Sequence, residues 1–209
     1  SVLVAALLSF TVLARLAPRL VSYAVGAMLG AAFLNLLPAA LESGPDAHEI
    51  LAATLVGLLA FFLLEKVAIW RHAHGPGDHH GHAHSHAAGE RPAGLMLLVG
   101  DAMHNLVDGV LIAAAFLTDP ALGVTVTLAV IAHEIPQEVG DFMVLLESGY
   151  TRGRALMLNA LSSLTAVIGG VAGYFALSAA QSVVPYVLAV SAASFIYIAI
   201  ADLVPNLHR

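Results

Sequence analysis

The chain alternates long apolar runs with short polar breaks. Most runs reach the length of about 20 residues that a helix needs to cross a bilayer, and breaks such as Asp119-Pro120 and the stretch 150–154 separate them. Loops between the later runs are only a few residues long. The pattern predicts an all-α, polytopic transmembrane helix bundle with seven spans, at about residues 1–14, 20–41, 50–70, 93–117, 121–146, 154–178 and 183–204.

The composition supports a membrane protein. The chain of 209 residues is 59% hydrophobic and only 11% charged, with a mean hydropathy of +0.88, far from the values of a soluble domain. We expect a single transmembrane domain over residues 1–209. Because the chain has no cysteine, any metal must be held by imidazole, carboxylate, amide or carbonyl groups. No basic patch with aromatic residues is present, so nucleic acid is not an expected partner.

One segment departs from the apolar pattern. Residues 71–92 hold seven of the eleven histidines among glycine, alanine and proline. Such a segment cannot pack a core, so it predicts a loop between the third and fourth spans. Its imidazoles could bind zinc, copper or nickel through many weak sites; the alternative is a solvated linker of biased composition.

The basic residues predict the orientation. Cytoplasmic flanks of membrane helices are enriched in lysine and arginine, and all eight basic residues fall on one side of the predicted topology. This side would be cytoplasmic, with the N-terminus outside and the His-rich loop inside. The residues are Arg15, Arg19, Lys66, Arg71, Arg91, Arg152, Arg154 and Arg209.

Ionisable groups recur on one face of the fourth span. A helix would place Asp101, His104, Asn105 and Asp108 together, at i, i+3, i+4 and i+7. His104 and Asp108 stand one turn apart, a spacing that lets an imidazole and a carboxylate bind one divalent ion. Ionisable groups at membrane depth are costly and usually mark an ion or proton path.

The fifth span carries a matching set. His133 and Gln137 repeat the one-turn spacing, which predicts a site with His104 and Asp108. Glu134, Glu138 and Asp141 form a second stripe about 100° round the same helix. Some of these acids must therefore be outer-shell partners, proton acceptors or a second site. The alternative is that the polar groups are hydrogen-bond partners between helices.

These motifs resemble the ZIP (Zrt/Irt-like) family of divalent-metal transporters, and more closely its LIV-1-like branch. The resemblance rests on HNLVDG at 104–109 and HEIPQEVGD at 133–141, with support from FFLLEK at 61–66 and the ending FIYIAIADLVPNLH. It implies an eight-helix fold, adjacent metal sites on the fourth and fifth helices, and transport by alternating access, of elevator type. The ligands that it implies here are His104, Asn105, Asp108, His133, Glu134, Gln137 and Glu138.

Two features depart from the family pattern. Gln137 stands where the LIV-1-like branch has histidine and other branches have glutamate, so a neutral amide should weaken or retune the site. In the second span, Ala32 replaces an expected acid, as does the alanine after Pro38, which argues against a metal entrance there.

The predicted function is transport of a divalent metal ion toward the cytoplasm, not enzymatic catalysis. Zinc is the expected substrate, with iron, manganese and cadmium ions as alternatives. Expected partners are the metal ion, the lipid bilayer and, in a homodimer, a second copy of the chain. A bacterial inner membrane is the expected location.

Two other functions compete with this prediction. HEIPQ at 133–137 is one residue short of the HExxH motif of an intramembrane zinc metalloprotease, but it lacks the second histidine and contains a proline. A metal sensor that does not transport is the third possibility, with the His-rich loop as the sensing element.

Overall fold

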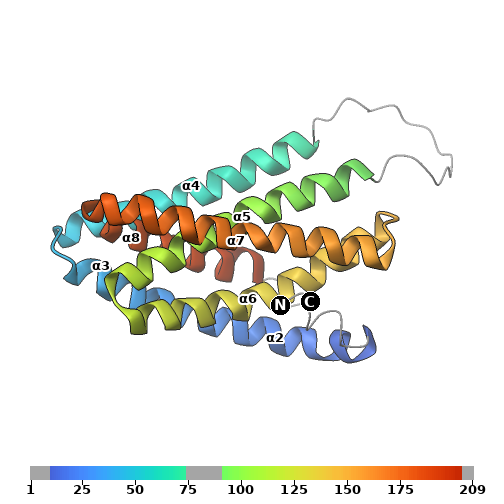
Figure 1. Ribbon diagram of the computed structural model, residues 1–209, viewed down its shortest axis with the longest axis horizontal. Coiled ribbons are helices and arrows are strands. Elements are labelled where there is room, and N and C mark those ends of the chain that lie inside the picture. Colours follow the sequence, from blue (N-terminus) through green and yellow to red (C-terminus); the bar gives the residue numbers. More distant parts are fainter. Residues whose placement is uncertain (1–9, 74–90, 204–209) are drawn as a thin grey trace.

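The computed structural model describes residues 10–73 and 91–203, and within them every regular element is helical. The helices lie side by side along the long axis of the molecule (Figure 1). In chain order the elements are α2 (Phe10–Ala31), η1 (Ala32–Leu36), α3 (Leu37–Glu42), α4 (Ala47–Ala73), α5 (Arg91–Thr118), α6 (Pro120–Glu147), α7 (Arg152–Ala179), η2 (Gln181–Val183), α8 (Val184–Tyr197) and η3 (Ile198–Leu203).

Five stretches of the described chain are long and apolar enough to cross a membrane: Val21–Glu42, Ala47–Leu64, Leu97–Thr118, Arg152–Ala179 and Gln181–Ala201. Helix α6 is as long as α7, at 28 residues, but it carries the polar fifth-span motif and is not among the five. The fold is thus a helical membrane bundle. The predicted spans 50–70, 93–117, 121–146 and 154–178 each fall within one long helix, α4 to α7 in that order. Predicted span 20–41 instead covers the end of α2 with η1 and α3, and span 183–204 begins at the end of η2 and covers α8 and η3.

The predicted boundary after the first span is wrong. A break at Arg15, Pro18 and Arg19 was expected to separate two spans, but α2 runs without interruption through all three residues. Proline removes one backbone donor and is tolerated inside membrane helices. Residues 1–9 lie outside the described part of the chain.

The basic residues of the described chain belong to one end of the bundle. Helix α2 begins there, α4 ends there, α5 begins there, and α6 turns back there into α7 (Figure 1). Lys66, Arg152 and Arg154 lie near these helix ends. We call this the basic end. Most of the predicted His-rich loop, residues 74–90, lies outside the described residues, while 71–73 and 91–92 belong to α4 and α5.

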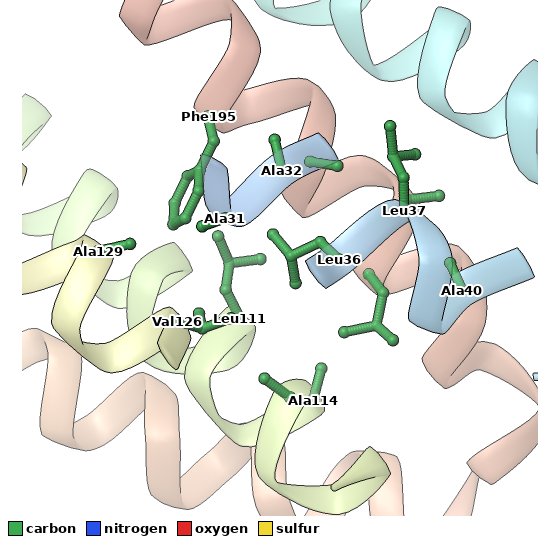
Figure 2. Close-up of a cluster of buried hydrophobic side chains, with 14 of the residues drawn as sticks. Ala31, Ala32, Leu36, Leu37, Ala40, Leu111, Ala114, Val126, Ala129 and Phe195 are labelled. Carbon is green, nitrogen blue, oxygen red and sulfur yellow. The ribbon is translucent and has the colours of Figure 1, made fainter. Parts of the chain in front are cut away.

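The main apolar core fills the half of the bundle opposite the basic end. It includes Leu36 from η1, Leu111 from α5, Val126 from α6 and Phe195 from α8, and Figure 2 shows these side chains converging. All four are less than 4% exposed, so the helices that carry the polar motifs are held together by tight apolar packing on this side.

The backbones of helices α5 and α7 pack very closely at two glycines, Gly109 and Gly169. A Cβ added at Gly109 would lie 1.9 Å from the carbonyl oxygen of Ala166, and one added at Gly169 would lie 2.0 Å from the carbonyl oxygen of Leu106. The Thr165 hydroxyl donates a hydrogen bond of 2.6 Å to the Ala102 carbonyl across the same interface. Small residues therefore lock α7 against the helix that carries His104 and Asp108.

Candidate metal centre

Helices α5 and α6 bring their polar motifs together as consecutive, antiparallel neighbours. Asp119 caps the start of α6 by accepting a hydrogen bond from the Leu122 amide at 2.9 Å, and Pro120 follows at the first helical position. The tight connection leaves His104 and Asp108 of α5 opposite the middle of α6.

Four side chains converge between these helices: His104, Asp108, His133 and Glu134. We call them the cage. One nitrogen or oxygen atom from each lies within 4.8 Å of the corresponding atoms of the others. Three of the four residues are buried, and the His104 side chain is 22% exposed.

The distances within the cage suit a four-coordinate cation. The His133 Nε2 atom lies 3.1 Å from Asp108 Oδ2 and 3.3 Å from His104 Nε2. Three further pairs, His104 to Asp108, His104 to Glu134 and His133 to Glu134, are each separated by 3.7 Å. Ligand atoms about 2.0–2.1 Å from a tetrahedral zinc ion are about 3.3–3.4 Å from one another. A zinc ion at the centre would need only small adjustments of these side chains.

The carboxylates of the cage lack hydrogen-bond partners. Both oxygens of Asp108 and both oxygens of Glu134 are buried and accept no hydrogen bond. A buried carboxylate without a partner is strongly unfavourable unless a cation or proton compensates it. The cage therefore has the charge as well as the geometry to hold a divalent cation.

The orientation of His133 is fixed from behind. Its Nδ1 atom lies 3.1 Å from the Ala129 carbonyl oxygen, one turn earlier in α6. A carbonyl can only accept, so Nδ1 carries the proton and Nε2 presents its lone pair to the cage. Such a hydrogen bond on the far nitrogen is the usual support of a metal-binding imidazole.

A second polar group lies beside the cage and is built around Asp101. Its Oδ1 atom accepts hydrogen bonds from the side-chain amides of Asn105 at 3.0 Å and Gln137 at 3.1 Å. Close to it, Glu138 accepts from the Ser163 hydroxyl, while the Asn159 amide donates 2.9 Å to the backbone carbonyl of Glu138. We call these six residues the inner polar group. It lies toward the basic end from the cage, because α5 begins and α6 ends on that side.

Of the seven predicted ligands, the structure brings together four. Asn105, Gln137 and Glu138 belong to the inner polar group instead. Glu134 completes the set with His104, Asp108 and His133, while the Gln137 amide donates to Asp101. The sequence pattern placed Asp101 on the polar face without a role, and it is the acceptor that holds both amides. Its i, i+4 spacing to Asn105 is the signal that could have indicated this contact.

A separate cavity opens at the end of the bundle opposite the basic end. It has a volume of about 580 Å³ and is lined by residues from η1, α3, α5 and α6, among them Asn35, Glu42 and Asp119. The apolar core separates it from the cage. Asn35 thus lines a polar recess even though the neighbouring acids expected from the resemblance are alanines.

The fold and the site define a class of protein: a helical membrane protein with four side chains of metal-binding type converging inside its bundle. The family model described as ZIP Zinc transporter matches residues 71–209. This match covers most of the chain and includes both polar motifs. The chain belongs to the ZIP zinc transporter family, and it is a multi-pass integral membrane protein.

Similar proteins include the zinc transporter YKE4 of Saccharomyces cerevisiae, 29% identical over 208 residues that cover 90% of this chain and 60% of the yeast protein. Human zinc transporter ZIP6 is 39% identical over 120 residues, 57% of this chain and 16% of its own length. Human zinc transporter ZIP4 is 31% identical over 247 residues, covering 90% of this chain and 38% of that protein. The chain thus spans less than two thirds of the length of each of these relatives. All three are eukaryotic, so they give no support to the predicted bacterial membrane.

Proposed function

We propose that this chain carries a divalent metal ion, above all zinc, across a membrane through the cage. The observation that carries the proposal is the convergence of His104, Asp108, His133 and Glu134 inside a membrane bundle, with buried carboxylate oxygens that no donor satisfies. A permanent structural site would be closed on all sides. In the cage, by contrast, the His104 side chain is partly exposed. Further polar groups beside the cage, such as Asp101 and Gln137, could bind an ion that leaves it.

The donor set supports zinc. Two imidazole nitrogens and two carboxylate oxygens form a mixed set that zinc accepts in tetrahedral geometry. The names of the similar proteins point to the same metal. Iron, manganese and cadmium ions stay alternatives, because imidazole and carboxylate groups bind them as well.

The surroundings of the cage support a path toward the basic end. On that side, Asp101, Gln137 and Glu138 offer oxygen atoms in the direction an ion would travel. On the other side the apolar core, including Leu111 and Val126, separates the cage from the cavity beside Asn35. Uptake by alternating access then requires this core to part while the inner side closes. The basic end would be cytoplasmic by the distribution of lysine and arginine.

Several finer points belong to this proposal. The exposed apolar faces of α4 and α7, with Leu55, Leu63 and Phe175 among their residues, would contact lipid. The count of seven spans stays a prediction, since the described residues contain five stretches that are long and apolar enough to cross a membrane. A homodimer and an inner-membrane location stay predictions.

The geometry gives no support to a metalloprotease. In that chemistry the glutamate of the motif must stay free to activate water while the residue three positions later binds zinc. Here Glu134 faces both imidazoles, and Gln137 donates its hydrogen bond to Asp101. Glu134 thus occupies the position of a metal ligand, and the residue three positions later is engaged elsewhere.

Zinc flux into proteoliposomes tests the proposal. The unmodified protein should accumulate zinc faster than empty vesicles, and His133→Ala should reduce the rate to the empty-vesicle level. His48→Ala is the matched control, because His48 is exposed at the start of α4 and lies apart from the cage. Flux equal to that of empty vesicles for the unmodified protein, or normal flux for His133→Ala, would contradict the proposal.

A further inference from the structure

The imidazole of His133 touches an aromatic ring from a helix that supplies no ligand. Phe195 of α8 packs against it with ring centroids 5.7 Å apart and an interplanar angle of 69°, an edge-to-face arrangement. Phe195 is fully buried and belongs to the main apolar core. In Figure 2 its ring extends from α8 toward Ala31 of α2, with Ala129 of α6 nearby.

Two contacts together determine where His133 Nε2 points. The Ala129 carbonyl holds Nδ1 from behind at 3.1 Å, but a single hydrogen bond leaves the ring free to tilt about it. Phe195 closes one side of the ring, and His104 lies on another with centroids 5.5 Å apart. Without Phe195, the imidazole would gain room to rotate away from Asp108 and Glu134.

We propose that Phe195 is a positioning residue for the metal cage, which couples α8 to the geometry of the site. This inference rests on the proposed function, because it assumes that the cage binds the cation. Helix α8 turns into the π-helix η3 (Ile198–Leu203) three residues after Phe195, and π-helical segments occur frequently at functional sites. A shift of α8 would move the ring and so change the affinity of the cage.

The test uses Co²⁺ as a spectroscopic substitute for zinc on the full chain in detergent. The visible bands of Co²⁺ depend on a tetrahedral environment, and the part of the spectrum that Asp108→Ala removes belongs to the cage. Phe195→Leu should weaken Co²⁺ binding to the cage about ten-fold, in the range seen when partners that orient ligands are lost, and should alter these bands. Phe195→Met fills the space more fully and should show the same change if the leucine variant does not fold.

Leu188→Ala is the matched control. Leu188 is fully buried in the same core and lies two turns before Phe195 on the same face of α8. It should lower thermal stability but leave the Co²⁺ bands and affinity unchanged. Unchanged bands and affinity in both Phe195 variants would overturn the inference while leaving the proposed function intact. If Asp108→Ala removed none of the Co²⁺ binding of the unmodified protein, both the inference about Phe195 and the proposed function would be contradicted.

Discussion

Of the two cage carboxylates, Asp108 makes the closer approach to an imidazole. Its Oδ2 atom lies 3.1 Å from His133 Nε2 and 3.7 Å from His104 Nε2, yet neither oxygen accepts a hydrogen bond. A carboxylate in this position is costly without a cation. The proposed metal binding accounts for a buried carboxylate at this position, whereas a role in stability does not.

Replacing Asp108 with alanine should abolish binding at the cage. Loss of groups that merely orient a ligand costs about 10- to 100-fold in affinity, so loss of a direct ligand should raise the zinc dissociation constant at least about 100-fold. The folded state should not suffer equally, because an uncompensated charge is removed as well. Zinc titration and thermal melting of the same preparation measure both effects. Binding close to that of the unmodified protein would remove Asp108 from the site.

Gln137 should matter much less for the cage than the sequence pattern suggests. Its amide donates a hydrogen bond to Asp101, which holds the side chain in the inner polar group. Gln137→Ala should therefore change the zinc dissociation constant less than about three-fold, which corresponds to about 0.6 kcal/mol. If Gln137 were a ligand, Gln137→His would complete the HExxH spacing and tighten zinc binding, and the same titration tests this alternative. A loss as large as that of Asp108→Ala would show that Gln137 is a ligand in the bound state.

The helix spacing predicted that three of the four cage residues, His104, Asp108 and His133, lie together. His104 and Asp108 are one turn apart on α5, and periodicity alone places them together. On α6 the same rule paired His133 with Gln137, whereas the structure uses His133 and its neighbour Glu134. The difference arises because the cage takes one residue from each of the two polar stripes of α6, His133 from the first and Glu134 from the second. That placement depends on how α5 approaches α6, which no local spacing encodes.

At the scale of the elements, the contact between α5 and α7 determines the position of the α5 ligands. Gly109 directly follows Asp108 and packs against the α7 backbone without space for a side chain. The sequence pattern predicted a span at 154–178, but it could not show which helix this span, α7, packs against. A glycine allows another helix to pack closely against its own, but the sequence does not say which helix that is.

Gly109→Ala should destabilise the bundle by separating these helices. The new methyl group would lie 1.9 Å from the Ala166 carbonyl oxygen and 2.5 Å from the Gly170 nitrogen, so the backbones must move apart. Overpacking of this kind costs about 1–3 kcal/mol or more, and the melting temperature in detergent should fall.

Gly100→Ala provides the matched control, since Gly100 lies on the same helix with no atom within 4 Å of the added Cβ. It should be neutral or stabilise by up to about 1 kcal/mol through helix propensity. Equal melting temperatures for the two variants would contradict the close approach of α5 and α7.

At the scale of the whole molecule, the apolar runs predicted the helical bundle well, because lipid and core both require continuous hydrophobic segments. The first boundary failed because Arg15, Pro18 and Arg19 look like a loop and yet belong to α2. Arginine at a helix end can extend its charge to the interface while its stem stays in the apolar region. A basic pair with proline is therefore a weak signal for a break in a membrane helix.

The orientation can be tested by labelling single cysteines, since the chain has none of its own. Ser182→Cys places a thiol in η2, at an exposed position opposite the basic end, and Ser85→Cys places one in the His-rich segment. If the basic end is cytoplasmic, a reagent that cannot cross membranes should label intact cells only at position 182. Labelling of position 85 alone would reverse the topology.

The measurement that tests the central claim most directly is an anomalous difference map at the zinc absorption edge, from crystals of the zinc-loaded protein. The account predicts a peak about 2.0–2.2 Å from one atom each of His104, Asp108, His133 and Glu134, where these atoms already converge. A peak that lies instead among Asp101, Gln137 and Glu138, with the four cage atoms left empty, would contradict it.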